Sequence, residues 1–254
     1  MATGSLGRCF SPLRASSPSS HLKVSCNSLS PPLFKTLSDI QSSGVIACLR
    51  APSAELALGA ARAAITGGIK VLEVVRSTPG VFEVLRELVE EHPTMSLGVG
   101  TILNAEDAKH AIKVGAKFLM SPAMIKDILA DVQGSEVLYI PGVMTPSEIL
   151  SAHSTGAKIV KIYPVSALGG VEYISALKKP FPHIPMVASQ GVQIGLVGEY
   201  IARGASAVVL SDAVFNTEAV VRGEYNAISR QAKVAASVAE EAIKRLDLVE
   251  QRHF

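Results

Sequence analysis

The chain has 254 residues, of which 48% are apolar and 18% charged, and it carries 24 basic and 22 acidic side chains. This composition predicts a globular protein with a sizeable core, and it gives no sign of a nucleic-acid partner. The sequence contains no run of about 18 uncharged apolar residues, so no membrane span is expected.

Residues 1–35 differ in composition from the rest of the chain. They contain nine serines, four prolines and four basic residues but no acid, and the first carboxylate is Asp39. Such a segment, without the apolar core of a secretory signal, is typical of an organelle transit peptide. We predict a disordered chloroplast transit peptide over residues 1–35, in which Val24-Ser25-Cys26 resembles a cleavage site, and hence a chloroplast location. The alternative is a disordered tail with no targeting role.

The remaining chain, residues 36–254, holds 20 basic and 22 acidic residues and is therefore slightly acidic. Cys9 and Cys26 fall in the N-terminal segment, which leaves Cys48 alone within the apolar run VIACL. A single cysteine forms no internal disulfide and has no metal-binding spacing. We expect Cys48 to be a small core residue.

From residue 44 onward, short apolar runs alternate with longer stretches of helical periodicity. Several of the longer stretches end in glycine, as helices often do. The segment 223–246 predicts a final amphipathic helix. The eight apolar runs predict strands at 44–50, 69–75, 96–100, 116–121, 136–142, 157–164, 184–189 and 205–211.

This alternation of strands and helices predicts parallel strands joined by crossover helices. Eight such units in one chain match a (β/α)8 TIM barrel, and we predict a single α/β barrel domain over residues 36–254. A doubly wound open sheet is the alternative. No G-x-G-x-x-G follows a predicted strand, which argues against a dinucleotide-binding version of that sheet.

Two charged side chains lie inside predicted strands, where burial makes a charge costly. Side chains alternate between the two faces of a strand, so Lys161 shares the lumen face with Ile159, and Glu73 faces the lumen if Leu72 faces the helices. A desolvated lysine can attack a ketone and form a Schiff base, and a nearby glutamate can transfer protons. The alternatives are a purely structural buried ion pair, or a lysine whose head reaches the barrel rim.

Four motifs resemble, in order, those of the class I 2-keto-3-deoxy-6-phosphogluconate and 4-hydroxy-2-oxoglutarate aldolases. The first is GGIKVLEV at 67–74, which contains Glu73. The second is GVGTILN at 98–104, which contains Thr101, and the third is YIPGVMT at 139–145. The fourth is KIYP at 161–164, which begins with the lysine. Arg50, in ACLRA at 47–51, matches a further arginine of many members.

The resemblance implies a metal-independent lyase that needs no cofactor and splits a 2-keto-4-hydroxy acid into pyruvate and an aldehyde. Lys161 would form the Schiff base and Glu73 would transfer protons. The resemblance also implies a small keto-acid substrate and a homotrimer. The implied substrate-binding residues are Arg50, Thr101, Pro122, Tyr163, Ser189, Gly191 and Ser211. The six histidines show neither H-x-H nor H-E-x-x-H spacing, which agrees with the absence of a metal.

This chain departs from the family pattern at two places. Many members carry an arginine four residues after the glutamate, whereas here Ser77 holds that place and Arg76 precedes it. The alternative to a site role for Arg76 is a surface arginine near a loop. Gln190 and Leu210 stand where members that bind a phosphorylated substrate have glycine. Asp212 would repel a phosphate if it faced the site, and the alternative is a helix N-cap or turn residue with no such effect. An unphosphorylated substrate is therefore favoured.

Three functions remain open from the sequence. The first is the plastid aldolase. The second is a different enzyme on the same barrel, such as a keto-acid decarboxylase or a sugar-phosphate isomerase or epimerase. The third is a non-catalytic or repurposed barrel that binds a small keto acid or a partner protein.

Overall fold

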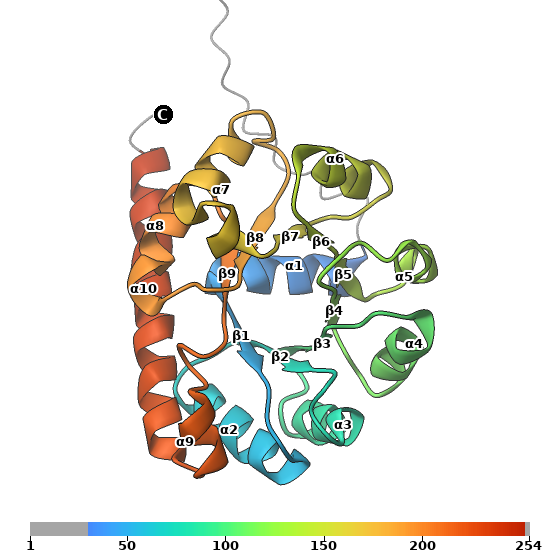
Figure 1. The fold of residues 1–254 in the computed structure, drawn as a ribbon, viewed down its shortest axis with the longest axis vertical. Helices are drawn as coiled ribbons and strands as arrows, with labels where there is room; N and C mark the ends of the chain where they lie inside the picture. The colour runs from blue at the N-terminus through green and yellow to red at the C-terminus, as the bar shows by residue number, and fades with distance from the viewer. Residues whose placement is uncertain (1–29, 252–254) are drawn as a thin grey trace, which may run out of the picture.

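A computed structural model describes residues 30–251 of the chain. Residues 1–29 and 252–254 lie outside this range, and so does most of the predicted transit peptide with its proposed cleavage site. Within the described residues, parallel strands alternate with helices around a central axis (Figure 1). The strands are β1 (Val45–Leu49), β2 (Val71–Val75), β3 (Ser96–Gly100), β4 (Phe118–Met120), β5 (Leu138–Ile140), β6 (Gly142–Val143), β7 (Val160–Ile162), β8 (Met186–Ser189) and β9 (Ala207–Leu210).

The strands found within residues 30–251 form one sheet in the order β5-β4-β3-β2-β1-β9-β8-β7-β6. Its two end strands, β5 and β6, are consecutive in the chain and are separated only by Pro141. β5 pairs with β4 and β6 pairs with β7, and the Pro141 carbonyl accepts a hydrogen bond of 2.8 Å from the Lys161 amide. The segment that contains β5 and β6, interrupted at Pro141, therefore forms both edges of the sheet and nearly closes the barrel. This confirms the predicted (β/α)8 class, because the fifth of the eight predicted runs, 136–142, covers β5 and the first residue of β6.

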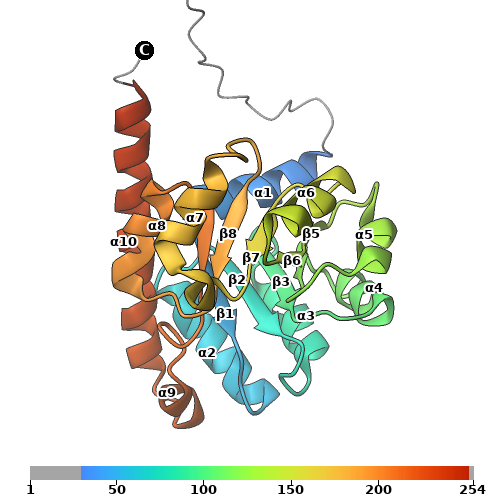
Figure 2. The same ribbon diagram turned by 45° about the horizontal axis from the view of Figure 1, so that its top comes forward.

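Helices cover the outside of the barrel (Figures 1 and 2), and the glycine-ended stretches of the sequence coincide with several of them. Helix α6 (Pro146–Ser154) follows β6 closely and begins with a capping box formed by Thr145 and Glu148. In this capping box the Thr145 amide donates to the Glu148 carboxylate at 2.7 Å. The helices are α1 (Pro31–Ser43), α2 (Ala54–Thr66), α3 (Val81–Glu91), α4 (Ala105–Lys113), α5 (Lys126–Val132), α6 (Pro146–Ser154), α7 (Gly170–Lys178), α8 (Val197–Ala202), α9 (Thr217–Val221) and α10 (Tyr225–Gln251), with 3-10 turns η2 (Val165–Leu168) and η3 (Ile194–Leu196).

Helix α1 was not predicted. It begins at Pro31, so residues 31–35, which we had assigned to a disordered segment, are helical, and the predicted boundary at residue 36 falls inside the helix. Proline at the first helical positions is compatible with a helix start, because the amides there have no intrahelical partner. In Figure 1 the helix lies across one end of the barrel. Its Leu37 and Ile40 are buried there.

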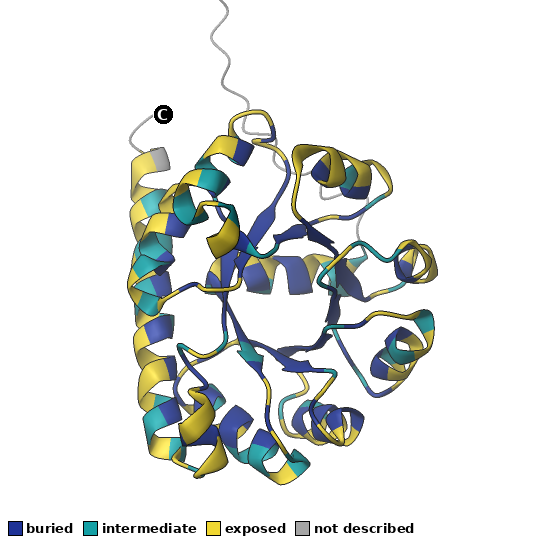
Figure 3. Cartoon of the chain, viewed as in Figure 1, coloured by how far each residue is buried: buried dark blue, intermediate teal, exposed yellow. Residues whose placement is uncertain are grey.

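Two apolar layers hold the molecule together. The outer layer lies between the strands and the surrounding helices, and the inner layer fills the lumen and contacts α1. Figure 3 shows buried residues along the strands and on the helices around them. The inner layer contains Leu37, Ile40, Ile46, Val71, Phe118, Met120, Leu138, Ile140, Ile159, Val187, Ala207 and Val209. Helix α1 thus seals the end of the barrel at which the strands begin, and it leaves the carboxyl ends of the strands as the open mouth.

Within the described residues, no helix is both long enough and apolar enough to cross a membrane. The 27-residue helix α10 packs along α2 and α8 instead, which accounts for its length.

Candidate active site

A layer of polar side chains lies directly above the apolar filling of the lumen. In β1 and β2, Ile46 and Val71 belong to the inner apolar layer, and alternation therefore turns Cys48 and Glu73, two residues further on, into the lumen as well. The strand register places Cys48 directly beside Glu73. Lys161 follows Ile159 into the lumen in the same way, as predicted from the alternation.

Lys161 is buried but forms no ion pair within residues 30–251. Its exposure is 7%, and its neighbours Val160 and Ile162 pack against the helices. Its ammonium nitrogen lies 5.2 Å from the centre of the Tyr163 ring, a distance at which the ring face attracts a cation. The structure therefore supports neither a structural ion pair with Glu73 nor a lysine head exposed at the rim.

Glu73 is the most deeply buried carboxylate of the lumen, with 1% exposure. Its side chain lies against Gly100 of β3, where a Cβ atom would come within 2.5 Å of Oε2. Oε2 is buried and accepts no hydrogen bond. A glycine is therefore required at position 100 for this carboxylate to occupy its place.

Two non-glycine residues at the mouth adopt left-handed backbone conformations. Thr101, directly after β3, has φ of 59°, and Gln190, directly after β8, has φ of 84°. Such conformations cost of order 1–3 kcal/mol and are concentrated at functional sites. Gln190 accepts a hydrogen bond of 2.5 Å from Ser166, and a Cβ atom on Gly191 would come within 2.4 Å of the same hydroxyl. The predicted residues Ser189 and Gly191 therefore border a tight turn at the mouth.

Pro122 lies at the mouth because of a close approach to β6. A Cβ atom on Gly142 would come within 2.2 Å of the Pro122 carbonyl, so this crossing requires the glycine of the YIPG motif. Beneath it, buried Ser121 donates to the Ile102 carbonyl at 2.7 Å, and the Tyr139 hydroxyl donates to Ser121 at 2.8 Å. These bonds hold the ends of β3, β4 and β5 together.

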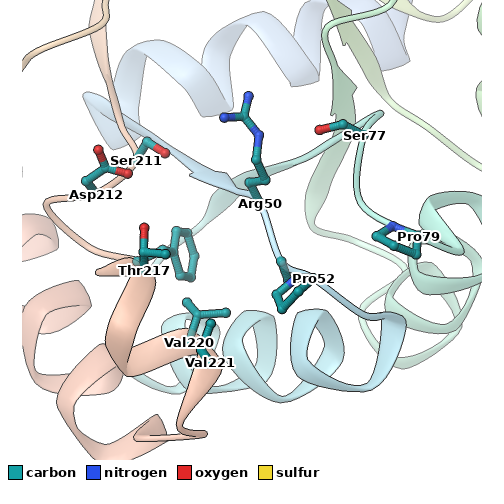
Figure 4. A pocket seen from close by; sticks show the side chains of 11 residues that line it. Arg50, Pro52, Ser77, Pro79, Ser211, Asp212, Thr217, Val220 and Val221 are labelled. Atoms are coloured by element: carbon teal, nitrogen blue, oxygen red, sulfur yellow. The ribbon is translucent and has the colours of Figure 1, made fainter.

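A pocket of about 390 Å³ opens beside the polar layer, between the segments that follow β1, β2 and β9. Figure 4 shows Arg50 between Ser77 on one side and Ser211 and Asp212 on the other. Thr217 and several apolar side chains complete the lining. The predicted residues Arg50 and Ser211 thus lie together. Leu210 does not narrow the mouth, because its side chain is fully buried in the outer apolar layer.

Arg76 points away from the lumen. Its Nε donates to Asp107 of α4 at 2.8 Å, and its guanidinium carbon lies 5.1 Å from the centre of the Phe82 ring on α3. The arginine is thus held outside the barrel by two helices, and Ser77, the next residue, lines the pocket instead.

Cys48 packs against the inner apolar layer, as the sequence predicts, but it is half-buried and also borders the polar layer. Burial and the neighbouring Glu73 carboxylate raise the pKa of the Cys48 thiol well above its usual value, while Lys161 and the Ser211 hydroxyl act in the opposite direction. The alternation that placed Lys161 and Glu73 in the lumen also applies to Cys48, and this signal was available in the sequence.

No cluster of three or more histidine, cysteine, aspartate or glutamate side chains within residues 30–251 is arranged to hold a metal ion. A buried amine and a buried carboxylate in one layer, at the carboxyl ends of barrel strands, define an enzyme class that acts on small carbonyl compounds through covalent imine chemistry.

Comparison with known proteins agrees with this class. Residues 37–231 match the family described as KDPG and KHG aldolase, where KDPG is 2-keto-3-deoxy-6-phosphogluconate and KHG is 4-hydroxy-2-oxoglutarate. The chain belongs to this family. It is therefore an aldolase, a carbon–carbon lyase, as the sequence predicted, and the non-catalytic alternative is not favoured.

Individual relatives cover most of the barrel. A 2-dehydro-3-deoxy-phosphogluconate aldolase of Treponema pallidum is 34% identical over 67% of this chain and 80% of its own length. A KHG/KDPG aldolase of Escherichia coli K12 is 28% identical over 73% of this chain and 87% of its own length. The KDPG aldolase of Legionella pneumophila, solved with pyruvate captured as a covalent carbinolamine, superposes with a TM-score of 0.73 at 26% identity, covering 81% of this chain and 98% of that one.

The contact between Gly100 and Glu73 yields a direct test. Gly100→Ala should lower kcat of the aldolase reaction by about tenfold or more, because the new Cβ atom forces the carboxylate out of its place. Gly195→Ala is the matched control, since no atom lies within 4 Å of its added Cβ. The measurement is steady-state turnover together with the melting temperature. Full activity in Gly100→Ala would show that the position of the Glu73 carboxylate does not matter.

Proposed function

We propose that the enzyme cleaves a 2-keto-4-hydroxy acid through a Schiff base on Lys161, with Glu73 as the proton-transfer group. The observation that carries this proposal is the burial of Lys161, at 7% exposure and without an ion pair, in the same layer as the buried Glu73. Because no carboxylate within residues 30–251 holds it in an ion pair, the Lys161 amine is available to attack a ketone. The carbinolamine captured in the Legionella relative supports an amine nucleophile in this family.

The proposed reaction needs only these two side chains and water. The Lys161 amine attacks the C2 ketone, Glu73 gives a proton to the carbinolamine hydroxyl, and this hydroxyl leaves as water to give an iminium ion. The Glu73 carboxylate then takes the proton of the C4 hydroxyl, the C3–C4 bond breaks, and its electron pair moves to the iminium to form an enamine while the aldehyde leaves. Glu73 returns that proton to C3, and hydrolysis of the resulting iminium releases pyruvate, free Lys161 and the proton that Glu73 supplied at the start. The iminium acts as the electron sink, so the proposed mechanism requires neither a metal nor a cofactor.

The residues around Lys161 are proposed to hold the substrate. Thr101 lies beside the lumen at the end of β3 and would bind the pyruvyl carboxylate, and the Tyr163 ring lies against the lysine head. Pro122 and Ser189 border the same opening. The part of the substrate beyond C4 would extend toward Arg50 and Ser211 in the pocket.

Borohydride trapping tests the nucleophile. With excess pyruvate, reduction should attach one pyruvyl group to Lys161, detected by peptide mass spectrometry, because borohydride reduces the imine to a stable amine. Lys161→Arg should give no adduct and should lose turnover by at least about a thousandfold. Lys158→Arg, at an exposed lysine of the same segment, should behave like the wild type. An adduct on another lysine, or none in the wild-type protein, contradicts the proposed role of Lys161.

We further propose that the preferred substrate is unphosphorylated, with 4-hydroxy-2-oxoglutarate as the leading case. The pocket carries one cation and one anion, Arg50 and Asp212, and this charge balance suits a single carboxylate better than a phosphate dianion. The turn after β8 carries Gln190, which accepts a hydrogen bond from Ser166, where members that bind a phosphorylated substrate have glycine. The E. coli relative, named for both substrates, supports either choice within the family.

The charge of Asp212 yields a prediction about substrate preference. The wild-type kcat/KM should be higher for 4-hydroxy-2-oxoglutarate than for 2-keto-3-deoxy-6-phosphogluconate. Asp212→Asn should raise kcat/KM for the phosphorylated substrate by about tenfold relative to the plain one, because removing a negative charge relieves repulsion of the dianion more than that of a single carboxylate. Asp247→Asn, at an exposed acid on α10, is the control. Equal changes for both substrates would rule out this electrostatic selection.

We propose that the protein is located in the chloroplast and that its transit peptide is cleaved before Pro31. The composition of the N-terminal segment supports the location, and helix α1 supports the position of the cut, because removing residues 31–35 would truncate the helix that seals the barrel. N-terminal sequencing of the protein after import into isolated chloroplasts should give a mature end between residues 24 and 31. A mature end inside α1, or no import, would contradict the proposal.

We also propose a homotrimer, which the family resemblance supports. Sedimentation equilibrium of the processed protein should yield three times the mass of one chain, whereas a monomer mass would contradict it.

A further inference from the structure

Glu73 has an unusual position for a group that must transfer protons repeatedly. The carboxylate is almost fully buried and faces the lumen, its Oε2 accepts no hydrogen bond, and no ion pair within residues 30–251 holds it. A buried carboxylate with so few partners can rotate, and the most attractive group for it in the same layer is the amine of Lys161. An ion pair between them would keep the amine protonated and unable to attack a ketone.

Cys48 is placed to prevent this movement. It lies directly opposite Glu73 in the pairing of β1 with β2, and its side chain enters the lumen beside the carboxylate. On its other side, β9 pairs with β1 so that Leu210, the last residue of β9, lies opposite Ala47, and the next residues along the chain are Ser211 and Cys48. The thiol therefore lies between the proton-transfer carboxylate and a hydroxyl that borders the pocket.

We propose that Cys48 is a positioning residue, whose S–H group donates to the Glu73 carboxylate and keeps it aimed at the reacting carbons rather than at Lys161. The Ser211 hydroxyl donates to the sulfur and holds the thiol in this orientation. This inference rests on the proposed Schiff-base function, since it assigns Cys48 a part in the work of Glu73.

The electrostatics of the layer agree with a donor role. Burial and the Glu73 carboxylate raise the pKa of the thiol well above its usual value, so it remains protonated and can donate at neutral pH. The same environment disfavours the thiolate, the form that acts as a nucleophile or is oxidised. This environment favours a cysteine that acts as a weak hydrogen-bond donor through its S–H group. The rest of its side chain is small and apolar and fits the lumen.

The kinetic test uses two substitutions in the full-length enzyme. Cys48→Val keeps the approximate volume but removes the donor, and it should lower kcat by about tenfold while KM changes by less than about twofold, because positioning of the proton-transfer group affects the chemical step. It should also slow borohydride trapping of pyruvate at neutral pH. Cys48→Ser retains a donor and should recover most of both rates. A wild-type kcat in Cys48→Val would overturn the proposal. The proposal would also be overturned if both variants lost the same share of kcat and that loss followed a fall in their melting temperatures.

A second readout does not depend on turnover. It is the ultraviolet absorbance of the Cys48 thiolate, measured as the difference between each protein and its Cys48→Ser counterpart. This absorbance should develop at lower pH in Glu73→Gln than in the wild type, because the substitution removes the negative charge that opposes ionisation of the thiol. An unchanged titration would overturn the thiol–carboxylate contact. If the titration shifts but the wild type forms no pyruvate adduct, the contact is supported and the Schiff-base function fails.

Discussion

The whole site depends on keeping an amine and a carboxylate together in an apolar lumen without allowing them to form an ion pair. Burying a charge costs several kcal/mol, and an ion pair is the usual way to offset that cost. Here Lys161 lies against the ring of Tyr163, and Glu73 lies against Gly100 and Cys48. Within residues 30–251 neither group is held in an ion pair, and this leaves both side chains for the proposed reaction with a ketone.

A dry lumen requires that the barrel be closed at the side and sealed at one end. Pro141 provides the lateral closure, because a proline has no amide hydrogen and the strand changes partner at that residue, from β4 before it to β7 after it. Helix α1 provides the seal by inserting Leu37 and Ile40 beneath the lumen filling. Together they leave the carboxyl ends of the strands as the open side, where the strained turns at Thr101 and Gln190 and the pocket beside Arg50 surround the polar layer.

The mouth of the barrel shows how one family scaffold can serve different substrates. In the proposed mechanism the lumen residues Lys161 and Glu73 act on the pyruvyl half of the substrate, and strand alternation fixes their place. The pocket residues Ser77, Asp212 and Thr217 lie on segments that follow the strands, where side chains can vary without disturbing the barrel. Arg76 is an example of this variation. Its guanidinium contacts Asp107 and the Phe82 ring outside the lumen, and Ser77 lines the pocket at the mouth instead.

Periodicity within the sequence was sufficient to predict the barrel class, the eight strand-forming runs and the lumen orientation of Lys161 and Glu73, because these depend on neighbours only one to four residues apart. Other features depend on which strand lies beside which, and only the tertiary structure decided them. Helix α1 is stabilised by residues far along the chain, such as Val209 of β9, and the change of partner at Pro141 needs both β4 and β7 in place. Cys48 looked like an ordinary core residue until the register of β1 with β2 and β9 placed its thiol between Glu73 and Ser211. Short-range periodicity carries no information about that register, because it is set by the packing of the closed barrel.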